Sequence, residues 1–109
     1  MSREHVLTLD LHDDPDLIAA YERHHAAVWP EVEQAIRESG ITDMRIFRLD
    51  TRLVMIIRAD DSFSFERKAA ADRANPHVQQ WEALMERFQR VEEFGSKWRE
   101  MRGIYRLDR

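Results

Sequence analysis

Residues 43–59, DMRIFRLDTRLVMIIRA, contain the feature that decides the fold, which is two β-forming runs in direct succession. The first run, 43–50, mixes apolar with charged residues. The second run, 52–59, is almost entirely apolar, as a strand buried on both faces would be. The junction at Asp50–Arg52 is short enough for a β-hairpin. The stretch therefore predicts a hairpin of two neighbouring strands.

The segment before the hairpin predicts a strand and a broken helix. HVLTLDL (5–11) alternates in the way a half-buried strand does. Asp14 is a typical N-cap residue and Pro15 a typical first residue of a helix, while Gly40 is a typical residue at the end of one. Pro30 interrupts the helical period between them, so we expect a kink or a restart there.

The segment after the hairpin predicts further helices and a last strand. Helices are expected over residues 62–73, with a serine cap, and again from Asn75–Pro76 onward. Residues 97–107, KWREMRGIYRL, predict a final strand with a bulge at Gly103. The apolar side of the later helix is expected to comprise Val78, Trp81, Met85 and Phe88, with Leu84 and Val91 beside them.

This order of elements is β-α-β-β-α-β, which predicts a single α+β domain over residues 1–109 with the ferredoxin-like plan. In that plan the helices cover one face of an antiparallel sheet and leave the other face open. A chain with three Trp and five Phe can cover the open face with a second copy of the same sheet. We therefore expect a homodimer.

Composition excludes several classes of protein and site. A net charge of −4 without runs of like charge argues against a nucleic-acid surface, and the absence of cysteine excludes disulfides and thiolate chemistry. No signal-like or membrane-spanning stretch is recognisable, so we expect a cytoplasmic protein that does not enter the membrane. The scattered histidines form no metal-ligand pair, which argues against a metal site, and the three glycines form no phosphate-binding or dinucleotide-binding loop.

The stretch YERHHAAVWPEVEQAI (21–36) carries unusual residues on an otherwise apolar helical stripe. Tyr21 and His25 are four residues apart and so share a helix face, where a histidine can exchange protons near neutral pH and a phenol can hold a ligand. Spacing alone favours the ordinary reading of both as core residues. Trp29 at the bend likewise reads first as structural filler.

A similar choice arises in VQQWEALM, within the later helix. The indole of Trp81 could be a platform for the C–H face of a sugar, although a tryptophan at such a position is more often plain core. Glu82 is turned by about 100° from Trp81 around the helix and is expected to face solvent.

The string Tyr21-x-x-x-His25-x-x-x-Trp29-Pro30-Glu31, with Gly40 and Gln80-Trp81 further on, resembles the L-rhamnose mutarotase family. The resemblance extends over nearly the whole chain and includes RLVMII in the buried strand and IYRL near the end. It implies a dimeric α/β barrel that interconverts the α and β anomers of a 6-deoxy-L-sugar without metal or organic cofactor. It further implies that His25 is the proton donor and that Tyr21 and Trp81 bind the sugar.

Two positions depart from the rhamnose enzymes. Met44 stands where they carry a sugar-contacting tyrosine, and Glu82 stands where they carry a second tryptophan. Members of the family with glutamate at the position of Glu82 look like L-fucose mutarotases. We expect both residues to contact the monosaccharide, with Trp29 nearby. His25 would protonate the ring oxygen and take that proton back, while Glu82, Glu31, His24 or a water could move the second proton.

Other functions share the predicted fold. Dimeric ferredoxin-like barrels include small monooxygenases and haem-binding proteins, and a histidine on the first helix could be a haem ligand. A module that binds the sugar without turning it over is a further alternative.

Overall fold

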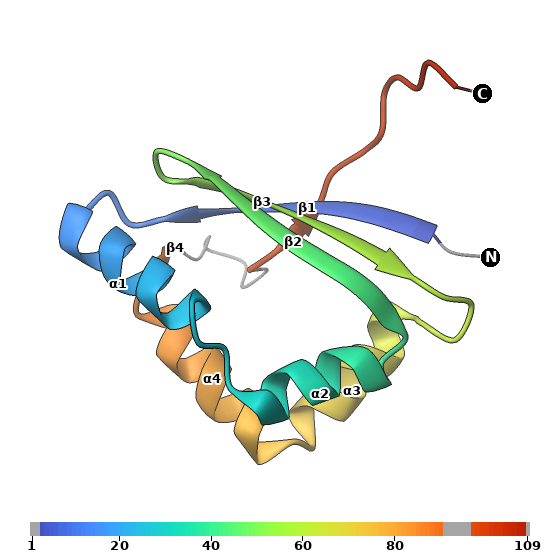
Figure 1. Cartoon of the computed structure of the whole chain (residues 1–109), viewed down its shortest axis with the longest axis horizontal. Helices are drawn as coiled ribbons and strands as arrows, with labels where there is room; N and C mark the ends of the chain where they lie inside the picture. Colours follow the sequence, from blue (N-terminus) through green and yellow to red (C-terminus); the bar gives the residue numbers. More distant parts are fainter. Residues whose placement is uncertain (1–2, 91–96, 109) are drawn as a thin grey trace.

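The computed structural model describes residues 3–90 and 97–108, in which an antiparallel sheet carries helices on one face (Figure 1). The sheet order is β2-β3-β1-β4, and β5 also pairs with β1. The strands are β1 (Arg3–Leu11), β2 (Ile41–Leu49), β3 (Arg52–Ala59), β4 (Gln89–Arg90) and β5 (Arg99–Glu100). The helices are α1 (Pro15–His25), α2 (Pro30–Glu38), α3 (Phe65–Arg73) and α4 (Pro76–Glu86). The predicted α+β ferredoxin-like class is confirmed.

Local capping signals start α1 and α4 where the sequence predicts, while α3 starts at Phe65 and not at residue 62. The Asp14 carboxylate accepts hydrogen bonds from the backbone N–H groups of Asp16 and Leu17 at 2.9 and 3.2 Å. The Asn75 side chain caps α4 in the same way, and Ser64 Oγ accepts from the backbone of Arg67 at the start of α3. Each cap satisfies a backbone donor that the first helical turn leaves unpaired.

The helical region before the hairpin restarts at Pro30, as predicted. The helix α1 ends at His25, and Trp29 is the N-cap of α2 with an extended backbone, φ −60° and ψ 134°. Steric contact with a following proline favours this extended conformation. The break lets α1 and α2 lie under different parts of the sheet (Figure 1).

The predicted hairpin and the predicted helix end are also confirmed. β2 and β3 pair antiparallel, with Phe47 opposite Val54 and Ile46 opposite Met55, and the turn between them holds Asp50 at φ 51°. Gly40 precedes β2 with φ 101°, a conformation that glycine adopts without a steric cost.

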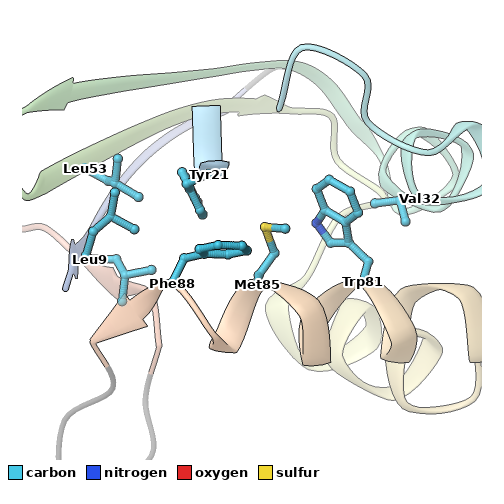
Figure 2. Packing of buried hydrophobic residues seen from close by; sticks show 8 residues of the cluster. Leu9, Tyr21, Val32, Leu53, Trp81, Met85 and Phe88 are labelled. Carbon is cyan, nitrogen blue, oxygen red and sulfur yellow. The ribbon is translucent and has the colours of Figure 1, made fainter. Parts of the chain in front are cut away.

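The main core lies between the sheet and the helices. The inner face of β1 contributes Leu9 and Leu11, and α4 contributes Trp81 and Met85, all less than a tenth exposed. Figure 2 shows Tyr21 pointing from α1 toward the ring of Phe88 and the side chains of α4. The aromatic side chains predicted to be core are therefore packed, and the question is which of them also border a cavity.

The C-terminal part differs from prediction. The helix α4 ends at Glu86, and Gln89–Arg90 forms a short strand on β1 that the helical period concealed. The final strand is confined to Arg99–Glu100, so the prediction of a strand over 97–107 with a bulge at Gly103 is wrong in extent. Beyond Glu100 the chain leaves the sheet on the side away from the helices (Figure 1), while Val91 lies outside the described residues.

The outer face of the sheet carries apolar as well as charged side chains and is incompletely covered. On β3, Leu53 and Ile57 face the helices and are buried, whereas Val54 and Ile56 face outward and are partly exposed. The prediction that β3 is buried on both faces is therefore wrong for the single chain, because no helix within residues 3–90 and 97–108 covers the outer side. On β2, Phe47 is 51% exposed and Leu49 is 75% exposed.

Candidate active site

A cavity of about 340 Å³ lies between the inner face of the sheet and the helices. Its size is at the small end of the range for ligand-binding pockets. Five of the six side chains predicted from the sequence line it: Tyr21, His25, Met44, Trp81 and Glu82. An adjoining hollow of about 470 Å³ shares only His25 and Met44 with this set, so we take the smaller cavity as the candidate site.

His25 is held in a defined orientation at the last residue of α1. Its Nδ1 lies 2.9 Å from the backbone carbonyl oxygen of Tyr21, one turn earlier. A carbonyl can only accept, so Nδ1 carries the hydrogen and the lone pair of the neutral ring is on Nε2. Burial lowers the pKa of His25 below its ordinary value of 6.5, the hydrogen bond to Tyr21 raises it, and the neighbouring His24 lowers it further. The neutral ring with a free Nε2 therefore predominates at pH 7.

Tyr21 supplies a buried phenol beside this imidazole. The two rings are 4.3 Å apart between centroids, and Tyr21 is 3% exposed. Burial raises the pKa of Tyr21 above its ordinary value of 10, while hydrogen bonding from the Gln89 side chain opposes that rise. The phenol is therefore protonated at neutral pH and keeps its hydrogen-bond donor.

Trp81 forms an aromatic wall of the cavity, and Trp29 lies behind that wall. The Trp81 indole contacts His25 edge-on at 5.7 Å and Trp29 edge-on at 5.1 Å between ring centroids. Trp29 does not line the cavity among the described residues; it packs against Trp81 at the margin of the main core.

Met44 and Glu82 lie on opposite sides of the same cavity. Met44 comes from the inner face of β2, and Glu82 comes from α4 next to Trp81. Glu82 is half-buried, so the expectation from helical geometry that it faces solvent is wrong. The structure thus brings together the two positions at which the chain departs from the rhamnose enzymes.

Several lining residues have no motif in the sequence that would reveal them. An ion pair on α3, Lys68 Nζ to Asp72 Oδ2 at 2.6 Å, faces the cavity, and Gln89, Lys97 and Trp98 come from the C-terminal part. The spacing of Lys68 and Asp72 is an ordinary i, i+4 pair, and Gln89 lies in a strand that was not predicted. These features of the sequence do not show whether the residues line a binding site or lie on the ordinary protein surface.

Two other candidates for moving a proton lie away from the cavity. His24 packs against Phe88, with 5.5 Å between ring centroids, and Glu31 is exposed near the start of α2. Neither lines the cavity. Of the side chains named for the second proton transfer, only Glu82 borders the same space as His25.

The part of the chain that the structure describes contains no group of three or more His, Asp or Glu side chains able to hold a metal ion. None of the helices in residues 3–90 and 97–108 combines the length and apolar character needed to cross a membrane.

Comparison with known sequences shows the family of the chain. The profile of the L-rhamnose mutarotase family matches residues 4–107 of the chain. The chain belongs to the L-rhamnose mutarotase family. An L-fucose mutarotase of Xanthomonas campestris pv. campestris is 46% identical over 104 residues, which cover 91% of this chain and 83% of the relative. The resemblance stated from the Tyr21–Glu31 string is therefore confirmed.

Solved structures agree on the fold of the mutarotase family. An L-rhamnose mutarotase from Formosa agariphila superposes with a TM-score of 0.73 at 17% identity, covering 97% of this chain and 99% of that one. A structure titled as a putative antibiotic biosynthesis monooxygenase from Nitrosomonas europaea superposes with a TM-score of 0.57 at 19% identity, covering 95% of this chain and 91% of that one. At such identities both likenesses concern the fold alone.

Proposed function

We propose that this protein is an aldose mutarotase, an isomerase that interconverts the α and β anomers of a 6-deoxy-L-sugar. The observation that carries the proposal is the neutral imidazole of His25 beside the Tyr21 phenol and the Trp81 indole in one small cavity. This is a group that can exchange a proton, a hydroxyl that can hold a sugar, and an apolar face for the ring. Membership of the L-rhamnose mutarotase family supports the same reaction.

Ring opening moves one proton off the anomeric hydroxyl and one onto the ring oxygen. Because the lowered pKa keeps His25 neutral, we propose that its Nε2 first accepts the proton of the anomeric hydroxyl. The bond between C1 and the ring oxygen then breaks as the C1 carbonyl forms, and the imidazolium gives its proton to the ring oxygen. Rotation about C1–C2 and the reverse steps yield the other anomer. One histidine can thus serve both transfers, whereas the expectation from sequence gave His25 the proton of the ring oxygen and left the other proton to a second group.

The remaining lining residues hold the sugar in this proposal. Trp81 packs against the C–H face of the ring, with Trp29 supporting its indole from behind. Glu82 accepts hydrogen bonds from sugar hydroxyls, and Met44 contacts the sugar from β2. The full-length similarity to an L-fucose mutarotase supports L-fucose over L-rhamnose as the preferred sugar.

NMR exchange spectroscopy tests this proposal, because it measures transfer of magnetisation between the anomeric protons of a sugar at equilibrium. L-fucose and L-rhamnose are compared side by side, each with and without the protein. We expect faster exchange than the spontaneous rate, with the larger acceleration for L-fucose. No acceleration with either sugar, despite binding seen by calorimetry, would leave a sugar-binding module instead of an enzyme.

A homodimer and a cytoplasmic location belong to the same proposal. The outer sheet face exposes Phe47 and Leu49, and the segment after β5 exposes Ile104, Tyr105 and Leu107. Large apolar side chains left exposed in this number are typical of subunit contacts. A second copy of the chain would cover both parts.

A further inference from the structure

Gln89 is a polar side chain enclosed in an apolar core. It is 5% exposed, and its neighbour in the chain, Phe88, is 4% exposed. Gln89 pairs with Leu11 across β4 and β1, and residues directly opposite in a sheet share a face. Leu11 is on the inner face, 1% exposed, so the amide of Gln89 points toward the helices and the cavity that it lines.

One end of this amide has a protein partner. The Gln89 side chain hydrogen-bonds Tyr21, and that bond cannot use Gln89 Oε1, which has no partner among the described residues. The Nε2 end of the amide is therefore the end that faces the Tyr21 hydroxyl oxygen. This contact leaves the phenol hydrogen of Tyr21 available for another acceptor.

The other end of the Gln89 amide, Oε1, has no hydrogen-bond partner among the described residues. Among the described residues, no donor lies within hydrogen-bond distance of Gln89 Oε1, although that oxygen is buried. Buried polar atoms are nearly always paired, so an orphaned acceptor on a cavity wall calls for an explanation. The neighbouring phenol presents the complementary group, a donor.

A sugar hydroxyl satisfies both groups at once, because it accepts one hydrogen bond and donates another. We infer that Gln89 is a sugar-binding residue, whose Oε1 accepts a hydrogen bond from a non-reacting hydroxyl of the monosaccharide while the Tyr21 phenol donates to the same hydroxyl. The inference rests on the proposed mutarotase function. It assigns to β4 a direct part in recognising the substrate.

A site that pairs with a hydroxyl discriminates against a sugar lacking it, since the buried protein groups are then left unpaired. The experiment combines a substitution in the protein with the removal of single hydroxyls from the sugar, and it compares the two effects on the exchange rate. Wild type and Gln89→Met, which keeps the length of the side chain, are assayed by anomer exchange with L-fucose and with its 2-, 3- and 4-deoxy derivatives. The control is Gln34→Met, the same change at an exposed glutamine of α2 that bonds only Glu38.

We expect Gln89→Met to lose about tenfold in exchange rate with L-fucose at low sugar concentration, the order of one hydrogen bond. One deoxy sugar should cost wild type a similar factor and cost Gln89→Met almost nothing more. Equal losses for Gln89→Met across all four sugars, relative to wild type, would mean a structural role and overturn the inference. So would full activity of Gln89→Met.

If Gln89→Met does not fold, wild type is titrated with L-fucose while the side-chain amide signal of Gln89 is followed by ¹H–¹⁵N NMR. A saturable shift that is absent with one of the deoxy sugars supports the inference, whereas no shift, or the same shift with all four sugars, overturns it. Failure of the proposed function is a separate result, in which wild type accelerates none of the four sugars.

Discussion

Replacement of His25 by glutamine removes the proposed proton-transfer group and keeps a side chain of similar length. The cost to the folded state is small, because within the described residues the His25 side chain makes one hydrogen bond, to the Tyr21 carbonyl, and two ring contacts. A hydrogen bond contributes about 0.5–1.5 kcal/mol, which is well within the stability of roughly 5–15 kcal/mol of an ordinary domain. The protein should therefore remain folded.

The effect on catalysis should be much larger. Proton transfer by a positioned side chain contributes about 10²–10⁴-fold to rate, which corresponds to roughly 3–5 kcal/mol in the transition state. We expect His25→Gln to reduce the catalysed part of the anomer-exchange rate by this factor, measured by NMR exchange with the spontaneous rate subtracted. His24→Gln is the matched control, since His24 is adjacent in sequence but packs on Phe88 away from the cavity. It should retain nearly full activity.

The pH dependence tests which form of His25 does the work. Its pKa lies below the ordinary 6.5, so the neutral form persists until the solution is more acidic than that. Exchange catalysed by wild type should be constant between pH 7 and 8 and should decline on acidification with a midpoint below 6.5. Activity within a few-fold of wild type in folded His25→Gln would refute the role of His25. A rate that rises on acidification would refute the proposed order, because the charged ring would then act first.

Three further predictions follow from single side chains or backbone positions. Tyr21→Phe should lower the exchange rate about tenfold and leave a folded protein by circular dichroism, because it removes one hydroxyl and keeps the ring; an unchanged rate would contradict its sugar contact. Gly40→Ala should destabilise by about 1–3 kcal/mol in urea unfolding, because φ is 101° and a Cβ would lie 2.6 Å from Ser62 Oγ; unchanged stability would contradict the assigned strain. Phe47→Glu should shift the mass in light scattering from twice the 13.1 kDa chain to the single chain, with Glu22→Gln on α1 as control; a Phe47→Glu dimer would mean that the outer sheet face is not the interface.

Elements governed by neighbouring residues could be predicted from the sequence. Asp14, Asn75 and Ser64 cap helices through bonds to residues two or three positions away, and Pro30 breaks a helix through contact with the residue before it. The C-terminal part could not be predicted in this way. Gln89–Arg90 is a strand because β1 offers it a free edge, and nothing within a few residues of Gln89 signals that partner.

The residues of the candidate site also fall into those that the sequence predicts and those that it does not. Tyr21, His25 and Trp81 could be named from sequence because they fall in a string with a recognisable family resemblance and a helical spacing. The helical period does not show whether these residues belong to the core or line a cavity, because both arrangements place them on the same face of the helix. The packing of α1, α4 and β2 around one space decided it, and turned Glu82 from an expected surface residue into a lining residue.

By itself, then, the sequence determined the order of the elements apart from β4, the starts of most helices and the histidine on which the proposed chemistry depends. These features follow from forces that act over a few residues along the chain. Tertiary structure alone decided which side chains share the cavity and the burial of His25, which lowers the pKa of that histidine. Those properties depend on burial and on contacts between residues far apart in sequence, such as Gln89 of β4 and Tyr21 of α1.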